Sequence, residues 1–215
     1  MLGLATMVAI GWGARASWLP MVGATLAVED PLTPVEFIVV SNAFARADTL
    51  EAAALYHDGI STRIVLPWWQ PDELDLEIVK LGVPWLPPTE LAHAILERKG
   101  IPREAIEVLR DPVDGLNAEV ASVGRFAHQR HPRSLLFITA RSHSQRARWL
   151  LERVVPPDTK ILVRGSRSDS FDPAAWWHSR EAGREVAMEY LRWANTFGLH
   201  DLWGAPPPPV AEPAR

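Results

Sequence analysis

The chain has no cysteine among its 215 residues. Disulfides, thiolate metal sites and cysteine nucleophiles are therefore excluded, and the redox compartment cannot be read from the sequence. Basic residues are not in excess either, because 22 lysines and arginines against 26 acidic residues leave a formal net charge of -4. Proteins that bind nucleic acid need a basic face to neutralise phosphates, so we exclude nucleic acid as a partner.

Glycine is missing where the common nucleotide-binding motifs require it. The first predicted strand is followed by "SNAFARAD", which contains no glycine, so neither the dinucleotide fingerprint nor a P-loop is present. Ser41 and Asn42 still offer hydroxyl and amide donors at this position. A Gly-x-Ser-x-Gly nucleophile elbow is also missing. The histidines show no metal-ligand spacing with carboxylates, so we expect no metal, and the sequence leaves any cofactor unidentified.

Charge is almost missing from the N-terminus, where Arg15 is the one charged residue among the first 28. The charge-free run before it is shorter than the roughly 20 residues that span a bilayer. Arg15 and Pro20 are both costly at the middle of a membrane. A secretory signal peptide fits less well, since no basic region precedes the apolar stretch. Two interpretations stay open: residues 1–29 form a membrane anchor or its remnant, or a short amphipathic helix packed on the domain.

From residue 36 onward, apolar runs of strand length alternate with segments of helical spacing. Each run is continuously apolar instead of alternating between apolar and polar, which is typical of a parallel sheet covered on both faces. The sequence therefore predicts a Rossmann-like, doubly wound α/β fold, with a mostly parallel five-stranded sheet in a three-layer α/β/α sandwich. The predicted strands are residues 36–41, 62–67, 105–109, 134–140 and 159–165.

The predicted helices follow from alanine-rich or amphipathic spacing and from residues that favour helix ends. Thr89 is expected to cap the third helix, which ends at Gly100. The proline-rich tail, residues 201–215, lacks apolar residues to pack and is predicted to be disordered. The domain itself is then expected to cover residues 30–200. The predicted helices are residues 45–57, 74–81, 90–99, 116–130, 143–154 and 173–197.

Ligands of such folds bind beyond the carboxyl ends of the strands, at a topological switch point. The segment after the fourth predicted strand, "ARSHSQRAR", is rich in cations. Ser142 and Gln145 have the spacing of a capping box, so a helix is predicted to begin at His143. Its free N–H groups and positive dipole end favour an anion. His143 and Arg146, on one helical face, add a donor and a fixed charge. This pattern predicts a site for a phosphate or a carboxylate.

Each of these residues also has a simpler interpretation. Arg146 can be a solvated charge on an exposed helix face, and His143 a polar residue of the first turn. Glu119, near the start of the preceding predicted helix, can simply complement the helix dipole. Alternatively, Glu119 pairs with His143 or Arg146 across the cleft and orients or neutralises it. The spacing alone leaves both interpretations open.

The order of several short motifs resembles the YdcF/SanA/ElyC-like family of bacterial cell-envelope proteins, a domain of unknown function. The likeness runs from about Asp30 to Phe197. It is carried by "VEFIVVS", "AAALYHDG", "GLNAEV", "FITARSHSQRAR", "FDPAAWWHSR" and "MEYLRW". The residues that match its most specific elements are Glu119, Thr139, His143, Arg146, Trp176, Trp177 and Glu189.

The resemblance implies a role in cell-envelope integrity and peptidoglycan precursor metabolism, with a phosphate- or carboxylate-bearing small molecule or lipid-linked precursor as the ligand. It also implies attachment to the bacterial inner membrane through the N-terminus, with the domain on the periplasmic side. His143 would be an acid or base and Glu119 its partner. Whether the protein is an enzyme stays open, with a non-catalytic envelope scaffold or sensor as the alternative. The remaining ligand-binding candidates are Ser41, Asn42, Arg46, Thr139, Ser142 and Arg146.

The chain departs from the family pattern around its first loop. Two glycines usual in the family are replaced by the sequence "SNAF", so the close backbone approach that glycine permits is lost. Arg46 matches only loosely an arginine expected at the start of the next helix. Leu116 stands where the family usually has a threonine, three residues before Glu119. These departures favour a changed ligand or a vestigial cleft.

Overall fold

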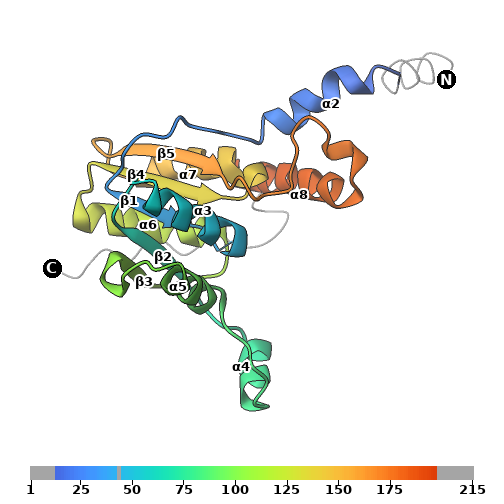
Figure 1. Cartoon of the computed structure of the whole chain (residues 1–215). Helices are drawn as coiled ribbons and strands as arrows, with labels where there is room; N and C mark the ends of the chain where they lie inside the picture. Colours follow the sequence, from blue (N-terminus) through green and yellow to red (C-terminus); the bar gives the residue numbers. More distant parts are fainter. Residues whose placement is uncertain (1–12, 43–44, 198–215) are drawn as a thin grey trace.

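The computed structural model of the chain describes residues 13–42 and 45–197. At its centre is a five-stranded sheet with the order β3-β2-β1-β4-β5, in which all neighbouring strands run parallel (Figure 1). The predicted Rossmann-like α/β fold is confirmed. The strands are β1 (Phe37–Val40), β2 (Ile64–Trp69), β3 (Ile106–Val113), β4 (Ser134–Thr139) and β5 (Lys160–Gly165).

Helices cover both faces of the sheet, and the alternation of side chains along each strand decides which helices each residue meets. Ile38 and Val40 of β1 belong to a core cluster with α3 and α5, whereas Phe37 and Val39 belong to a cluster with α6 and α7. Continuous apolar strands are needed because both faces are buried. The helices are α2 (Arg15–Ala24), α3 (Ala45–His57), α4 (Glu73–Lys80), α5 (Pro88–Arg98), α6 (Leu116–Arg130), α7 (Ser144–Val154) and α8 (Arg180–Thr196).

The strand order creates a switch point between β1 and β4. The chain moves outward from β1 through β2 to β3, then returns through α6 to place β4 on the other side of β1. The connections that leave β1 and β4 therefore diverge at the carboxyl edge of the sheet, which is where ligands of such folds bind. Ser41 follows β1 and Ala140 follows β4 at this point.

The prediction of one long helix over residues 173–197 is wrong about where the helix begins. The chain first forms a turn, in which the Asp172 carboxylate accepts the N–H of Ala174, and a short 3-10 helix, η3 (Trp176–His178). α8 begins only at Arg180, where the Ser179 side chain accepts the N–H of Ala182. Aspartate and serine compete for backbone hydrogen bonds and so favour turns and helix caps over helix interiors.

The predicted cap at Thr89 is also wrong. α5 begins two residues earlier than predicted, at Pro88, and its N-cap is Pro87. The Thr89 hydroxyl instead accepts the Trp69 N–H at 2.7 Å and donates to the Pro67 carbonyl at 2.9 Å. It therefore satisfies two backbone groups at the end of β2. Gly100 does follow the end of α5, with a φ of 80° that suits glycine.

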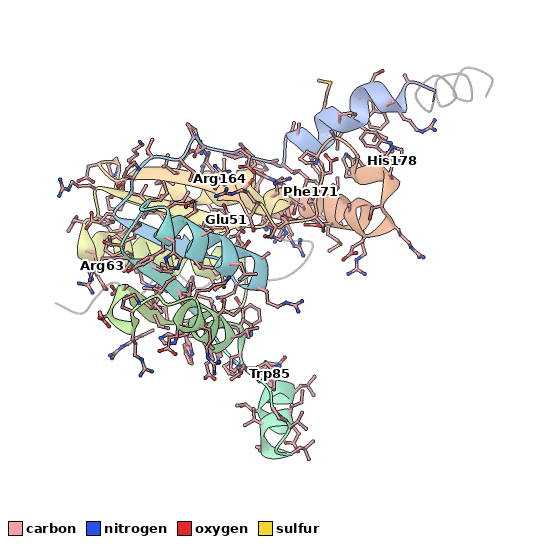
Figure 2. The ribbon with its side chains drawn as sticks, in the orientation of Figure 1. Glu51, Arg63, Trp85, Arg164, Phe171 and His178 are labelled. Atoms are coloured by element: carbon pink, nitrogen blue, oxygen red, sulfur yellow. The ribbon has the colours of Figure 1, made fainter. Side chains whose placement is uncertain are left out.

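A third apolar cluster joins the N-terminal segment to the C-terminal helix. Leu26, Phe171 and Val186 are all buried there, and the Trp176 indole donates to the Leu19 carbonyl at 2.8 Å. Figure 2 shows Phe171 beside α8, on the side that faces α2. Packed residues of the domain thus begin before the boundary predicted at Asp30.

The predicted N-terminal anchor stays a prediction. Residues 1–12 lie outside the described residues, as does the predicted disordered tail, residues 201–215. None of the helices in the part of the chain that the structure describes has the length and apolar character needed to cross a bilayer.

Candidate functional site

Glu119 lies at the switch point and is 1% exposed. Ser41 continues the alternation of β1 on the face that α6 covers, and its hydroxyl donates to Glu119 Oε2 at 2.7 Å. The Asn42 N–H donates to Glu119 Oε1 at 2.9 Å. Burial raises the pKa of the Glu119 carboxyl, and these two hydrogen bonds oppose that rise only in part. The carboxylate therefore ties the first turns of α6 to the loop after β1.

The predicted pairing of Glu119 with Arg146 is not a direct ion pair in the described residues, but the Arg146 charge does oppose the rise in the pKa of the Glu119 carboxyl. Arg146 instead binds Glu189 of α8, with Nε 2.5 Å from Oε1 and a second nitrogen 3.2 Å from Oε2. A third nitrogen of Arg146 donates to the side-chain oxygen of Asn117 in α6, at 3.2 Å. Arg146 is 4% exposed and Glu189 is fully buried. The alternative of Arg146 as a solvated helix-face charge is therefore wrong.

His143 lies against the same carboxylate. Its Nε2 is 3.4 Å from Glu189 Oε2 and 3.5 Å from a guanidinium nitrogen of Arg192. Burial lowers the pKa of the His143 imidazole; the Glu189 carboxylate opposes this shift, while the nearby guanidiniums add to it. Burial thus favours the neutral imidazole, the form in which it can accept a proton.

The helix predicted to begin at His143 has a different start. A short 3-10 turn, η2 (Arg141–His143), precedes α7, whose first residue is Ser144. The predicted capping box does not form, because the Ser142 hydroxyl donates to the Glu185 carboxylate of α8. Burial raises the pKa of Glu185, and the hydrogen bond from Ser142 opposes the rise. Ser142 therefore attaches α8 to the end of β4.

Two cavities meet at Arg192. The smaller, about 280 Å³, is lined by residues 114–118 at the start of α6 and by Arg146, Arg192 and residues 195–196. The larger, about 940 Å³, is lined by His143 and the exposed face of α8. Arg192 lines both cavities and also contacts Glu189 at 3.4 Å. The two predicted residues His143 and Arg146 therefore reach adjacent cavities, not a single one.

The smaller cavity has the chemistry of an anion site. Gly115 precedes α6 and has no side chain with which to cap it. The first-turn N–H groups of α6 have no intrahelical partner and carry the positive end of the helix dipole. Two guanidiniums, those of Arg146 and Arg192, add full charges. Asp114, at the exposed rim, is the carboxylate in this lining.

The remaining predicted ligand-binding residues line neither cavity. Thr139 ends β4 on the face that α6 and α7 cover, and its fully buried hydroxyl has no hydrogen-bond partner among the described residues. Asn42 is half-buried, and its side-chain amide donates to the Pro67 carbonyl at 3.1 Å. Arg46 is exposed in the first turn of α3 and lines neither cavity. The structure thus brings Ser41 and Asn42 to Glu119 and leaves Arg46 apart.

Three charged residues of α8 contact the site but are not predicted as site residues from the spacing of the sequence: Glu185, Glu189 and Arg192. Glu189 is named in the sequence analysis only as a match to the family pattern. A signal was available, because Val186, Glu189 and Trp193 have the spacing of one helical face. A carboxylate within an apolar stripe indicates a buried charge that needs a partner.

Comparison with known proteins gives a fold likeness and no more. No family model and no curated protein matches the sequence. The pantoate-beta-alanine (pantothenate synthetase) structure from Thermus thermophilus is 14% identical, with a TM-score of 0.38, over 85% of this chain and 75% of that one. An aureusimine biosynthetic cluster reductase domain is 16% identical, with a TM-score of 0.33, over 71% of this chain and 57% of that one. Likeness at this level says nothing of ligand or reaction. Within the described residues, no group of three or more His, Asp or Glu is placed to hold a metal.

Proposed function

We propose that the protein binds a phosphate- or carboxylate-bearing ligand in the smaller cavity and that this binding serves cell-envelope biogenesis or integrity. The observation that carries the ligand proposal is the position of Arg146. Its guanidinium is fixed by Glu189 and Asn117, so it lines the cavity in one orientation beside the first turn of α6. A cation that is already ordered loses little entropy when an anion binds.

The envelope role rests on the resemblance to the YdcF/SanA/ElyC-like family, and with it the attachment to the inner membrane, the periplasmic placement of the domain and a peptidoglycan precursor as the ligand. The apolar N-terminal sequence leads directly into α2, which packs on the domain next to α8. A membrane-attached N-terminus would thus hold the site near the bilayer, where lipid-linked precursors are found.

An acid–base step is the chemistry that this arrangement suits, if the ligand reacts. Burial lowers the pKa of His143, which lines the larger cavity, and Arg192 lines both cavities. A ligand whose anionic group lies beside Arg146 reaches His143 past Arg192. The imidazole would then accept a proton from the ligand, and the Glu189 carboxylate would stabilise the imidazolium that forms.

The ligand proposal is tested by thermal unfolding of the full chain with inorganic phosphate, pyrophosphate or acetate. A ligand that binds only the folded state raises the midpoint, by an amount that corresponds to about 2.7 kcal/mol at a hundred times its Kd. We expect Arg192→Gln to weaken binding about 10- to 100-fold, because a charged hydrogen bond contributes about 1.5–3 kcal/mol.

Arg103→Gln is the matched control, since the Arg103 side chain is 80% exposed and lies in η1 (Arg103–Ala105), away from both cavities. It should bind as the unchanged chain does. If none of the three anions shifts the midpoint, or if both variants bind equally, the smaller cavity is not an anion site.

The envelope role needs a cellular test. A strain that lacks the protein is complemented with the unchanged chain, with Arg192→Gln or with His143→Ala, and its survival is measured under detergent and cell-wall antibiotics. Loss of complementation by both variants, at normal protein levels, supports a role for the cavities in the envelope. Normal survival of the strain without the protein contradicts it.

One observation favours the alternative of a non-catalytic scaffold or sensor. Both carboxylate oxygens of Glu189 already satisfy Arg146, so the guanidinium has an internal partner without any ligand. The loop after β1 also lacks the glycines that allow a close approach. If His143→Ala complements fully while Arg192→Gln does not, binding without catalysis is the better description.

A further inference from the structure

A helical arm extends from the carboxyl edge of the sheet. It comprises residues 70–87, with α4 at its tip, and Figure 1 shows α4 standing away from the body and from α8. Figure 2 shows Trp85 at the base of the arm. No residue of α4 is buried, and Leu74 and Leu81 are 74% and 71% exposed. Large aliphatic side chains at this exposure, gathered on one short helix, mark an interaction surface.

The arm is built to hold its shape without tertiary packing. Asp72 accepts the Asp75 N–H at 2.8 Å, and Asp75 accepts the Asp72 N–H at 3.0 Å, which completes a capping box. Prolines stiffen the two segments that join α4 to the body: Pro71 on one side, Pro84 and Pro87 on the other. Isolated helices of eight residues are normally marginal, so these features specifically preserve an exposed helix.

One face of α4 combines apolar and acidic side chains. Glu73 and Glu77 are four residues apart and so share a side of the helix. Leu74 and Leu81, seven residues apart, lie next to them around the helix axis. Asp72 and Asp75 are used in the capping box. Glu73 forms no ion pair within the described residues, and Glu77 contacts Lys80 at 3.3 Å in an exposed pair, which contributes little stability.

The exposed face of α8 carries two arginines, with Glu181 and Glu185 beside them in the lining of the larger cavity. Arg180 and Arg184 are also four residues apart, both are exposed, and neither forms an ion pair in residues 13–42 and 45–197. Met188, 42% exposed, and Leu191, 50% exposed, continue this face by one and two turns. Arg180, Arg184 and Met188 line the larger cavity, which also contains His143.

We propose that the α4 arm of one chain docks on the α8 face of a second copy, over the larger cavity. Glu73 and Glu77 would pair with Arg180 and Arg184 of the other chain, while the leucines of the arm cover its Met188. Because α4 stands away from α8 of its own chain (Figure 1), the proposed contact joins two molecules. A two-fold axis makes the contact reciprocal, which closes the assembly as a dimer.

In the proposed dimer, the α4 arm of the second chain covers the larger cavity, which is open in a single chain. Each His143 then lies beneath an arm of the neighbouring chain, away from bulk water. This inference does not depend on the anion proposal, because the dimer forms without a ligand and is measured without one.

Charge reversal tests the docking. The full chain is compared by analytical ultracentrifugation, in one detergent, with a Glu73→Lys/Glu77→Lys variant and an Arg180→Glu/Arg184→Glu variant. We expect the unchanged chain to have twice the monomer mass and each variant the mass of one chain. An equimolar mixture of the two variants should again form dimers, because the reversed arm of one faces the reversed α8 of the other.

The mixture distinguishes docking from misfolding, since two misfolded chains would not restore each other. A monomeric unchanged chain, a dimer that survives both reversals, or a mixture that stays monomeric overturns the proposal. A second readout uses the lack of native cysteine. Chains with Glu77→Cys, mixed with chains with Arg184→Cys, should form an interchain disulfide, whereas Arg103→Cys paired with Glu77→Cys should not.

Discussion

The guanidinium of Arg146 binds both carboxylate oxygens of Glu189, a residue 43 positions later in the chain, and both side chains are buried. The pair joins α7 to α8, and Asn117 extends the link to α6. Its geometry is the two-nitrogen, two-oxygen arrangement that arginine forms with carboxylates.

Removal of one member of this pair should be strongly destabilising. We expect Glu189→Ala to lower the free energy of unfolding by about 3–5 kcal/mol, because Arg146 would keep its charge in a buried position without its partner. The double variant Arg146→Met/Glu189→Leu should recover most of this loss, since it removes both charges. Urea unfolding of Arg146→Met, Glu189→Leu, the double variant and the unchanged chain gives the coupling energy. Additive losses would mean that the pair does not act as a unit.

Glu119 should make stability depend on pH. Its raised pKa means that the folded state keeps the proton at a pH where the unfolded carboxyl, with an ordinary value of 4.5, has lost it. Relative to Glu119→Gln, the unchanged chain should therefore lose stability as pH rises from 4.5 to the raised folded pKa, and then stay level. The measurement is the difference in unfolding free energy between the two proteins across pH. A difference that is flat, or that grows in favour of the unchanged chain, would contradict a raised pKa at this carboxyl.

His143 should give the opposite slope. Its lowered pKa means that, as pH falls below the ordinary value of 6.5, the unfolded imidazole takes up a proton before the folded one does. Relative to His143→Gln, the unchanged chain should lose stability from pH 6.5 down to the folded pKa. Nuclear magnetic resonance titration of the ring, assigned by its loss in His143→Gln, should give a midpoint below 6.5. A midpoint above 6.5 would show that Glu189 outweighs burial.

Gly23 should tolerate no side chain, because α2 packs there against the turn before η3. A Cβ at Gly23 would meet the carbonyl oxygen of Pro173 and lie 2.6 Å from Trp176 Cδ1. We expect Gly23→Ala to destabilise the chain by about 1–3 kcal/mol through overpacking. The matched control is Gly183→Ala in α8, where a Cβ meets nothing within 4 Å and the gain in helix propensity is about 0.5–1 kcal/mol. Equal effects of the two substitutions would mean that α2 is not docked as described.

The sheet was predictable because its strands are buried on both faces, so apolar runs such as those around Ile38 and Leu136 are unambiguous. The meeting of Ser41 with Glu119 follows from the same topology, since both lie at the switch point. The partner of Arg146 was not predictable from spacing. It depends on where α8 crosses α7, which is set by the third apolar cluster and by a turn at Asp172 that delays the start of α8.

That third cluster has a mechanical consequence. Leu26 packs against Val186, and the Tyr190 hydroxyl donates to the Val22 carbonyl at 2.9 Å. The segment that contains Val22 and Leu26 therefore holds α8 in place. Glu189 lies on the same face of this helix as Val186, and Arg192 follows it by three residues. Tension on the segment before α2 would therefore be transmitted through α8 to both cavities.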